Sequence, residues 1–352
     1  MPKTNTFEAS AQLCGEKCGL VPSRGIRSAK WLAVLGLCLL LSPSGLPVEK
    51  TPGADGIRFC IPFWILKDGA PVQPRMGRED LSIFAGPEPL QITRQEQPGT
   101  PTFLFLAFDL VEDQAPINAA KQSLAQEVRK LGPEYWVGLI GVQETLSVIQ
   151  DPTKDKRLLL KKIRQSRQFG KAGLLESIQA LADFSSALMR KSSVRVAVIL
   201  VTDSDVANYR TEYSNPPINR SDRRDLSRRF EGRALQDEIS RLSTAMVRFP
   251  IPLLVVHVDP GRDSLNRTYQ DGLVQVTGAA GGRLFLSKST GDIPRTLQEA
   301  FEWADSFYAV EFEVPPRPSG LFEIEARLGA TLSPTMRLTH PARLFFPSDA
   351  QP

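Results

Sequence analysis

Histidine and cysteine are scarce in this chain of 352 residues, which contains 2 His and 4 Cys. So few of these residues argue against zinc chemistry and a disulfide scaffold, and they limit histidine-dependent catalysis. Cys14 and Cys18 form the pair CGEKC, but no second pair completes a metal site. His257 falls inside the apolar stretch LLVVHVD and is predicted to be a core residue, while His340 has no metal-ligand spacing.

An excess of one charge and the common catalytic motifs are also missing. The 43 Lys and Arg residues nearly balance 39 Asp and Glu residues, so the net charge is +4 and gives no reason to expect strong nucleic-acid binding. The turn after the first buried strand has no glycine, and no phosphate-loop, H-E-x-x-H or G-x-S-x-G motif occurs. The glycine cluster at 278–282 precedes a strand and is predicted to form a turn. These absences favour a protein that is not an enzyme.

The apolar run WLAVLGLCLLLS spans residues 31–42, after a polar and basic stretch and before the small residues of SPSG. This order predicts a secretory signal peptide over residues 1–44. The run is shorter than the ~20 residues that a membrane-spanning helix needs. An uncleaved anchor and a buried core helix are the alternatives. After cleavage, Cys60 is the remaining cysteine, and a core role is expected for it.

The mature chain divides by its patterns of apolar residues. Residues 45–56 form a linker rich in Pro and Gly, and residues 57–100 form a small β-rich segment. From 101 to 307, buried strands such as TFLFLAFD and VRVAVILVT alternate with helical spacing, which predicts an α/β domain with a doubly wound, mostly parallel sheet and helices on both faces. Residues 308–352 return to β character and end in a tail. These late strands either extend the first β segment or form a hairpin layer of their own.

The ends of two predicted strands carry aspartates. The first buried strand ends at Asp109 in the sequence DLVED, and a later one ends VILVTDSD, with Asp203. This pattern resembles the von Willebrand factor type A (VWFA) family, whose first strand ends in D-x-S-x-S and whose later strand ends in TDG or TDS. In that family these residues and a threonine before a helix form a metal-ion-dependent adhesion site, where a divalent cation takes a carboxylate of a protein partner.

The motif is degenerate in this chain. Val111 stands at the first serine position and Ala172 at the threonine position, and neither side chain offers an oxygen. The resemblance implies a weak Mg²⁺ or Ca²⁺ site at Asp109, Asp113 and Asp203, since hard cations accept carboxylates and water. The alternative is that the strand-end acids cap helices or pair with arginines.

The flanks of the α/β domain strengthen the resemblance. The segments KDGAPV and DLSIFAGPEPLQI precede it, and YAVEFEV and GLFEIEARL follow it. This order over residues 57–328 is similar to bacterial VWFA-related proteins of the acidobacterial type. The resemblance implies a binding fold more than a defined activity.

A long polar loop, residues 204–233, directly follows Asp203. A loop of this length in a compact domain is usually functional or disordered. Its arginines could recognise carboxylates of a partner. Because acids are interleaved with them, self-paired solvated charge in a mobile loop or a helix extension is the alternative. The candidate partner-binding residues are Arg220, Arg223, Arg224, Arg228 and Arg229.

Together these features predict an exported bacterial protein-interaction module, periplasmic or extracellular. It would bind a protein partner, and not nucleic acid, at the top of the sheet with weak or no dependence on a divalent cation. A membrane would be contacted only through an uncleaved N-terminal anchor. A metal-dependent hydrolase that uses the same acids and a purely structural envelope component are the alternatives.

Overall fold

The computed structural model describes residues 56–347, apart from 112–113, 144–145, 167–169, 193, 210–226 and 331. The side chains of 227–231 are likewise not described. The predicted signal segment 1–44 and residues 45–55 of the predicted linker lie outside the described part. Within that part, no helix combines the length and apolar character that crossing a bilayer requires.

A six-stranded sheet forms the centre of the α/β domain. Its strand order is β10-β9-β8-β5-β6-β7, and all neighbours are parallel except β6 and β7. Every residue of β5 and β8 is buried, because the continuous apolar runs of these strands are covered on both faces. This confirms the predicted α/β sheet. The strands are β5 (Thr102–Asp109), β6 (Tyr135–Gly141), β7 (Ser147–Thr153), β8 (Arg195–Thr202), β9 (Leu253–His257) and β10 (Arg283–Leu286).

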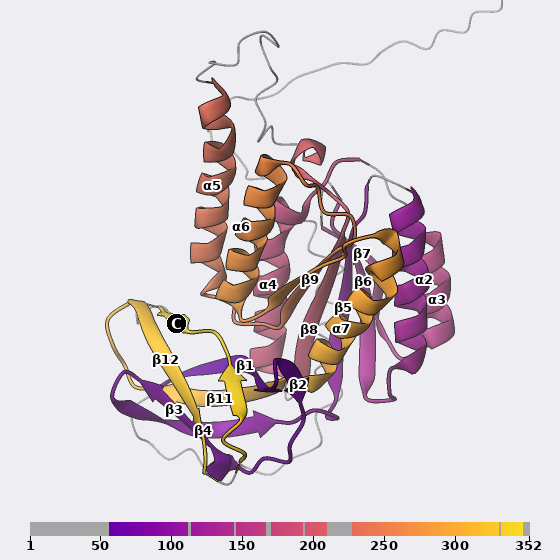
Figure 1. Cartoon of the computed structure of the whole chain (residues 1–352). Coiled ribbons are helices and arrows are strands. Elements are labelled where there is room, and N and C mark those ends of the chain that lie inside the picture. Colours follow the sequence, from indigo (N-terminus) through magenta and orange to yellow (C-terminus); the bar gives the residue numbers. More distant parts are fainter. Residues whose placement is uncertain are drawn as a thin grey trace, which may run out of the picture. The chain divides into compact units, whose positions relative to one another are not determined.

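Two groups of helices flank this sheet (Figure 1). One group contains α2 (Gln114–Lys130), α3 (Lys156–Gln165) and α7 (Ile293–Ser306). The other contains α4 (Leu174–Lys191), α5 (Ser227–Met246) and α6 (Ser264–Ala280). The predicted turn at 278–282 is corrected in part, because residues 278–280 belong to α6. Gly281 ends that helix with a φ of +88°, a left-handed conformation that glycine adopts without steric cost.

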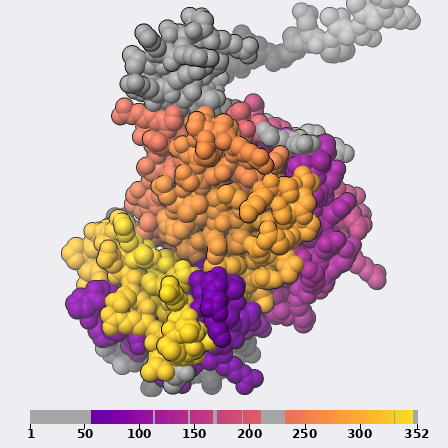
Figure 2. Space-filling model, viewed as in Figure 1, coloured from indigo at the N-terminus to yellow at the C-terminus, as the bar shows by residue number. Residues whose placement is uncertain are grey.

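The segments before and after the α/β domain build one antiparallel sheet of eight strands. Its order is β13-β1-β11-β4-β3-β12-β14, with β2 paired to β1. The late strands therefore extend the first β segment, and the two flanks are not separate small units. Figure 2 shows the N-terminal and C-terminal strands side by side in indigo and yellow. The strands are β1 (Ile57–Lys67), β2 (Ala70–Val72), β3 (Leu81–Ala85), β4 (Glu88–Glu96), β11 (Tyr308–Val314), β12 (Gly320–Leu328), β13 (Met336–Thr339) and β14 (Arg343–Phe346).

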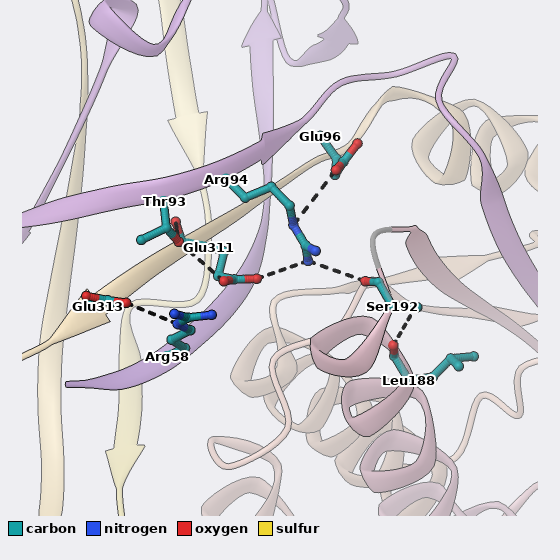
Figure 3. Close-up of polar contacts among 8 residues, drawn as sticks. All are labelled: Arg58, Thr93, Arg94, Glu96, Leu188, Ser192, Glu311 and Glu313. Carbon is teal, nitrogen blue, oxygen red and sulfur yellow. Dashed lines mark hydrogen bonds and ion pairs between the residues drawn. The ribbon is translucent and has the colours of Figure 1, made fainter. Parts of the chain in front are cut away.

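A cluster of charged side chains joins this sheet to the end of α4 (Figure 3). On β4, the Arg94 guanidinium lies 3.1 Å from a carboxylate oxygen of Glu311 and 3.8 Å from one of Glu96. Its Nη2 also donates to the carbonyl of Ser192, 3.4 Å away, just after α4. Cys60 lies buried beside this cluster, and burial raises the pKa of its thiol to about 12. Cys60 is therefore a neutral core side chain, as the sequence predicted.

Candidate functional site

Asp109, the last residue of β5, lies fully buried at the carboxyl edge of the six-stranded sheet. Its Oδ1 accepts a hydrogen bond of 2.9 Å from the backbone N–H of Gly173, which precedes α4. Its Oδ2 accepts one of 3.1 Å from the hydroxyl of Thr202, at the end of β8. The pKa of Asp109 is raised to about 7, because burial and, to a smaller extent, the charge of Asp203 outweigh the lowering effect of the hydrogen-bond donors. The carboxyl group thus ties the start of α4 and the end of β8 to its own strand.

Asp203 follows β8 and is also fully buried. Its Oδ1 accepts a hydrogen bond of 2.7 Å from the backbone N–H of Val111, in the loop between β5 and α2. In the other direction, its own N–H donates to the carbonyl of Asp109 over 3.4 Å. The two predicted acids therefore come together. Asp203 holds the loop after β5, and Asp109 holds the residue before α4 and the end of β8.

Hydroxyl and imidazole groups complete this network. The Ser204 hydroxyl donates to the Asp109 carbonyl over 3.3 Å, and its N–H donates to the Thr202 hydroxyl over 3.1 Å. His257, at the end of β9, places Nε2 3.1 Å from the Ser204 carbonyl. Burial lowers the pKa of His257 to about 4, so the neutral ring donates through Nε2–H at neutral pH. His257 is the core residue that the sequence predicted, and it also supports the loop after Asp203.

Lowering the pH from about 6.5 to about 4 should reduce the free energy of unfolding by about 3 kcal/mol through His257. The unfolded state takes up a proton near the ordinary pKa of 6.5, whereas the folded state does so only near 4, so stability is lost as the pH falls through this window. The buried Nδ1 has no hydrogen-bond partner among the described residues that would stabilise the charge. Urea unfolding of wild type and His257→Gln at several pH values isolates this contribution, and a pH-independent difference between them would contradict it.

Ala172, at the predicted threonine position, pairs with the chain just after a short helical turn, η2 (Val206–Asn208). Ala172 is buried, and its N–H donates to the carbonyl of Asn208 over 3.0 Å. The first N–H of η2 donates to Asn266 Oδ1 over 2.9 Å. Next to it, the hydroxyls of Tyr209 and Tyr269 lie 2.5 Å apart and are buried. Position 172 therefore contributes to packing and backbone pairing.

The described residues fit a resident cation poorly. Both oxygens of Asp109 accept protein hydrogen bonds, and Val111 binds Asp203 through its backbone N–H, so the carboxylates face donors of the chain. Among the described residues, no group of three or more His, Cys, Asp or Glu side chains is arranged to hold a metal ion. Asp113, the third predicted ligand, lies outside them, so the three-aspartate set stays a prediction.

The predicted partner-binding arginines are also beyond what the structure describes. Arg220, Arg223 and Arg224 lie within 210–226, outside the described residues. Arg228 and Arg229 lie in the first turn of α5, but their side chains are not described. Their role therefore stays a prediction. The predicted loop 204–233 is corrected in part, because residues 206–208 form η2 and α5 begins at Ser227.

Sequence reasoning missed the groups that bind the two acids. Gly173, Thr202 and Ser204 provide them with donors or tie the adjacent backbone, and Asn266 anchors the following turn. Thr202 and Ser204 flank Asp203 in the sequence TDS, so small hydroxyl residues around a strand-end acid were the available signal. The part played by Gly173 is a backbone contact, which no side-chain pattern reveals.

No protein-family model matches the sequence, and no curated protein matches it. Solved structures with a similar fold include the vWF domain of the type V pili tip protein Mfa5 from Porphyromonas gingivalis, with a TM-score of 0.38 and 14% identity over 56% of this chain and 93% of that chain. A von Willebrand factor type A protein from Catenulispora acidiphila matches with a TM-score of 0.41 and 8% identity, over 84% of this chain and 74% of that chain. The conserved hypothetical protein BatB from Bacteroides thetaiotaomicron matches with a TM-score of 0.37 and 14% identity, over 58% of this chain and 100% of that chain. The likeness to type A domains concerns the α/β fold alone.

Proposed function

We propose that this chain is an exported bacterial protein-interaction module that binds a protein partner at the carboxyl edge of the six-stranded sheet without a required cation. One observation carries the proposal. Asp109 and Asp203 are turned into the protein, where they hold the loop after β5, the loop before α4 and the loop after β8 together. Ligands of open α/β sheets bind at this edge, and loops fixed by buried hydrogen bonds form a preorganised surface.

The burial of these two acids disfavours a catalytic role for them. A catalytic carboxylate must come within hydrogen-bond reach of its substrate, and both Asp109 and Asp203 are fully buried. We therefore propose a binding protein in preference to a hydrolase. The degenerate adhesion site, the acidobacterial-type relationship and an extracytoplasmic location belong to this proposal.

Titration calorimetry of the protein with Mg²⁺, Ca²⁺ and Mn²⁺ tests the cation independence. We expect no saturable heat, because the carboxylate oxygens already accept protein hydrogen bonds. The same titration of Asp109→Ala is the control. Saturable binding to wild type that disappears in Asp109→Ala would establish a cation site and contradict the proposal. Hydrolysis of generic ester or phosphoester substrates by wild type, lost in the same variant, would favour the hydrolase.

The partner surface needs its own experiment. The wild-type chain and a variant with serine at positions 220, 223, 224, 228 and 229 are used as bait for envelope proteins of the source bacterium, with EDTA and with Mg²⁺. We expect one partner to be retained by wild type in both buffers and lost in the variant, because the arginine side chains at these positions would recognise its carboxylates. Retention only with Mg²⁺, or equal retention by the variant, would contradict the proposed mode of binding.

A further inference from the structure

A groove between α2 and α3 is lined, among the residues that the structure describes, by cations and amides and by no carboxylate. Its volume is about 370 Å³. Figure 1 shows the two helices side by side at one edge of the six-stranded sheet. None of the described residues in the carboxyl-edge loops discussed above lines it. The lining residues are Asn118, Lys121, Gln122, Ala125, Gln126, Arg129 and Arg164.

The surroundings of the groove carry an excess of positive charge that the near-neutral composition conceals. The ten residues of α3, KRLLLKKIRQ, contain five basic residues and no acidic one. Leu159 and Ile163 are buried, so the apolar side of α3 faces the protein, and the exposed Arg157, Lys161 and Arg164 lie on the solvent side. A surface of this kind attracts an acidic partner and accelerates its association.

Two lysines hold the walls of the groove in place. Lys121 on α2 donates to the carbonyl of Ser166, just after α3, over 2.6 Å. Lys156, at the start of α3, donates to the carbonyls of Arg129 and Leu131 at the end of α2. Because each lysine binds the carboxyl-terminal end of the other helix, α2 and α3 run in opposite directions and are fastened at both ends. The groove is therefore preformed.

The remaining polar side chains are arranged for a ligand. Among the described residues, no hydrogen bond or ion pair involves the side chains of Arg129 and Arg164 or of the three amides. The amides Asn118, Gln122 and Gln126 follow one another at intervals of four residues, which places them in a row on one face of α2. From position 118 to 129 the helix rises ~16 Å, a length that about five residues of an extended peptide span.

We propose that this groove binds an extended acidic segment of a partner protein, rich in Asp or Glu. Arg129 and Arg164, which lie towards opposite ends of the antiparallel pair, would bind carboxylates, and the amide row would pair with the N–H and C=O groups of the peptide. Amides that both donate and accept favour a peptide over a phosphate surface. None of the exposed large hydrophobic residues, Val274, Leu286 and Leu321, lies on α2 or α3, which disfavours membrane insertion. Among the described lining residues, none is aromatic and available for base stacking.

Fluorescence anisotropy of the full chain with a labelled peptide of ten glutamates tests this proposal. Arg129→Ser combined with Arg164→Ser should weaken binding by about tenfold or more, since each arginine would make charge-assisted hydrogen bonds. The matched control is Arg75→Ser with Arg78→Ser, two exposed arginines of the β-rich part that remove the same charge. The control should change the affinity by less than about twofold, because only the general attraction is reduced.

Three results would overturn the proposal. They are absence of peptide binding by wild type, equal weakening by the two double variants, and tighter binding of a single-stranded oligonucleotide or of vesicles containing phosphatidylserine than of the peptide. The Arg129 and Arg164 variant retains Asp109, Asp203 and residues 204–233. Failure of this proposal would therefore leave the proposed partner surface at the carboxyl edge untouched.

Discussion

Replacing Arg195 with methionine should lower the free energy of unfolding by about 4 kcal/mol. Arg195 begins β8 and is fully buried. Its Nη2 donates to the carbonyls of Ala304 and Asp305, at 3.2 and 2.7 Å, and its Nη1 donates to that of Gln97 at 3.4 Å. The substitution leaves three partly or fully buried acceptors without these donors, and each costs roughly 1–3 kcal/mol.

The position of Arg195 explains why so much depends on one side chain. Ala304 and Asp305 lie in the last turn of α7, where carbonyls have no partner within the helix and favour a positive charge. The guanidinium also lies 4.2 Å from the ring centre of Phe307, between α7 and β11. Burial lowers the pKa of Arg195, and the Tyr135 and Asp305 side chains oppose that effect. Arg195 therefore joins the first residue of a central strand to the chain segment that enters the eight-stranded sheet.

Urea unfolding of wild type, Arg195→Met and Arg195→Lys measures this effect. Lysine keeps the charge but cannot reach three carbonyls from one planar group, so its loss should be intermediate. The control is Arg241→Met, which removes an exposed arginine paired with Glu238 on α5 and should have a much smaller effect. Equal losses for Arg195→Met and Arg241→Met would show that the buried network contributes little.

The central sheet could be predicted from the sequence because its strands carry their own signal. The runs TFLFLAFD and VRVAVILVT are apolar at nearly every position. This pattern is typical of strands that are buried on both faces of a sheet. Two helices were not predicted, and each has a physical reason. In α3, five of the ten residues are basic and few are apolar, so the apolar spacing of a helix is weak. The helix begins after Asp155, whose side chain accepts a hydrogen bond from the N–H of Leu158. In α6, the small residues at its end hide the helical spacing.

The sequence left open whether the late strands join the first β segment, and it did not reveal the orientation of the acids, for a different reason. Strand β1 pairs with β11 from Ile57 and Val314 to Phe63 and Tyr308, and no local pattern records pairing over such a separation. Likewise, the motif places Asp109 and Asp203 at strand ends, but the N–H groups of Gly173 and Val111 decide that they turn inward. The sequence showed the two acidic side chains, but no residue type reveals the backbone N–H groups of other segments that donate hydrogen bonds to them.

Raising the pH from about 4 to about 7 should cost the wild-type protein about 4 kcal/mol of stability through Asp109. In the unfolded chain this carboxyl ionises near its ordinary pKa of 3.8, whereas burial raises its pKa to about 7 in the folded protein. The folded state therefore retains a proton that the unfolded state has lost. The stabilising contribution is fully present below about pH 4 and is lost as the pH rises through 7.

Asp109→Asn provides the comparison, because asparagine resembles the protonated carboxyl and does not titrate. In urea unfolding, the variant should become more stable relative to wild type by about 4 kcal/mol between pH 4 and pH 7. His257 titrates in the same range with the opposite sign, but it is present in both proteins, so its contribution cancels in the difference. A difference that stays constant with pH would contradict the raised pKa. Adding Mg²⁺ at pH 7 should leave the difference in stability unchanged, because we propose that no cation binds at Asp109. A bound cation would instead favour the ionised carboxylate and stabilise the wild-type protein alone.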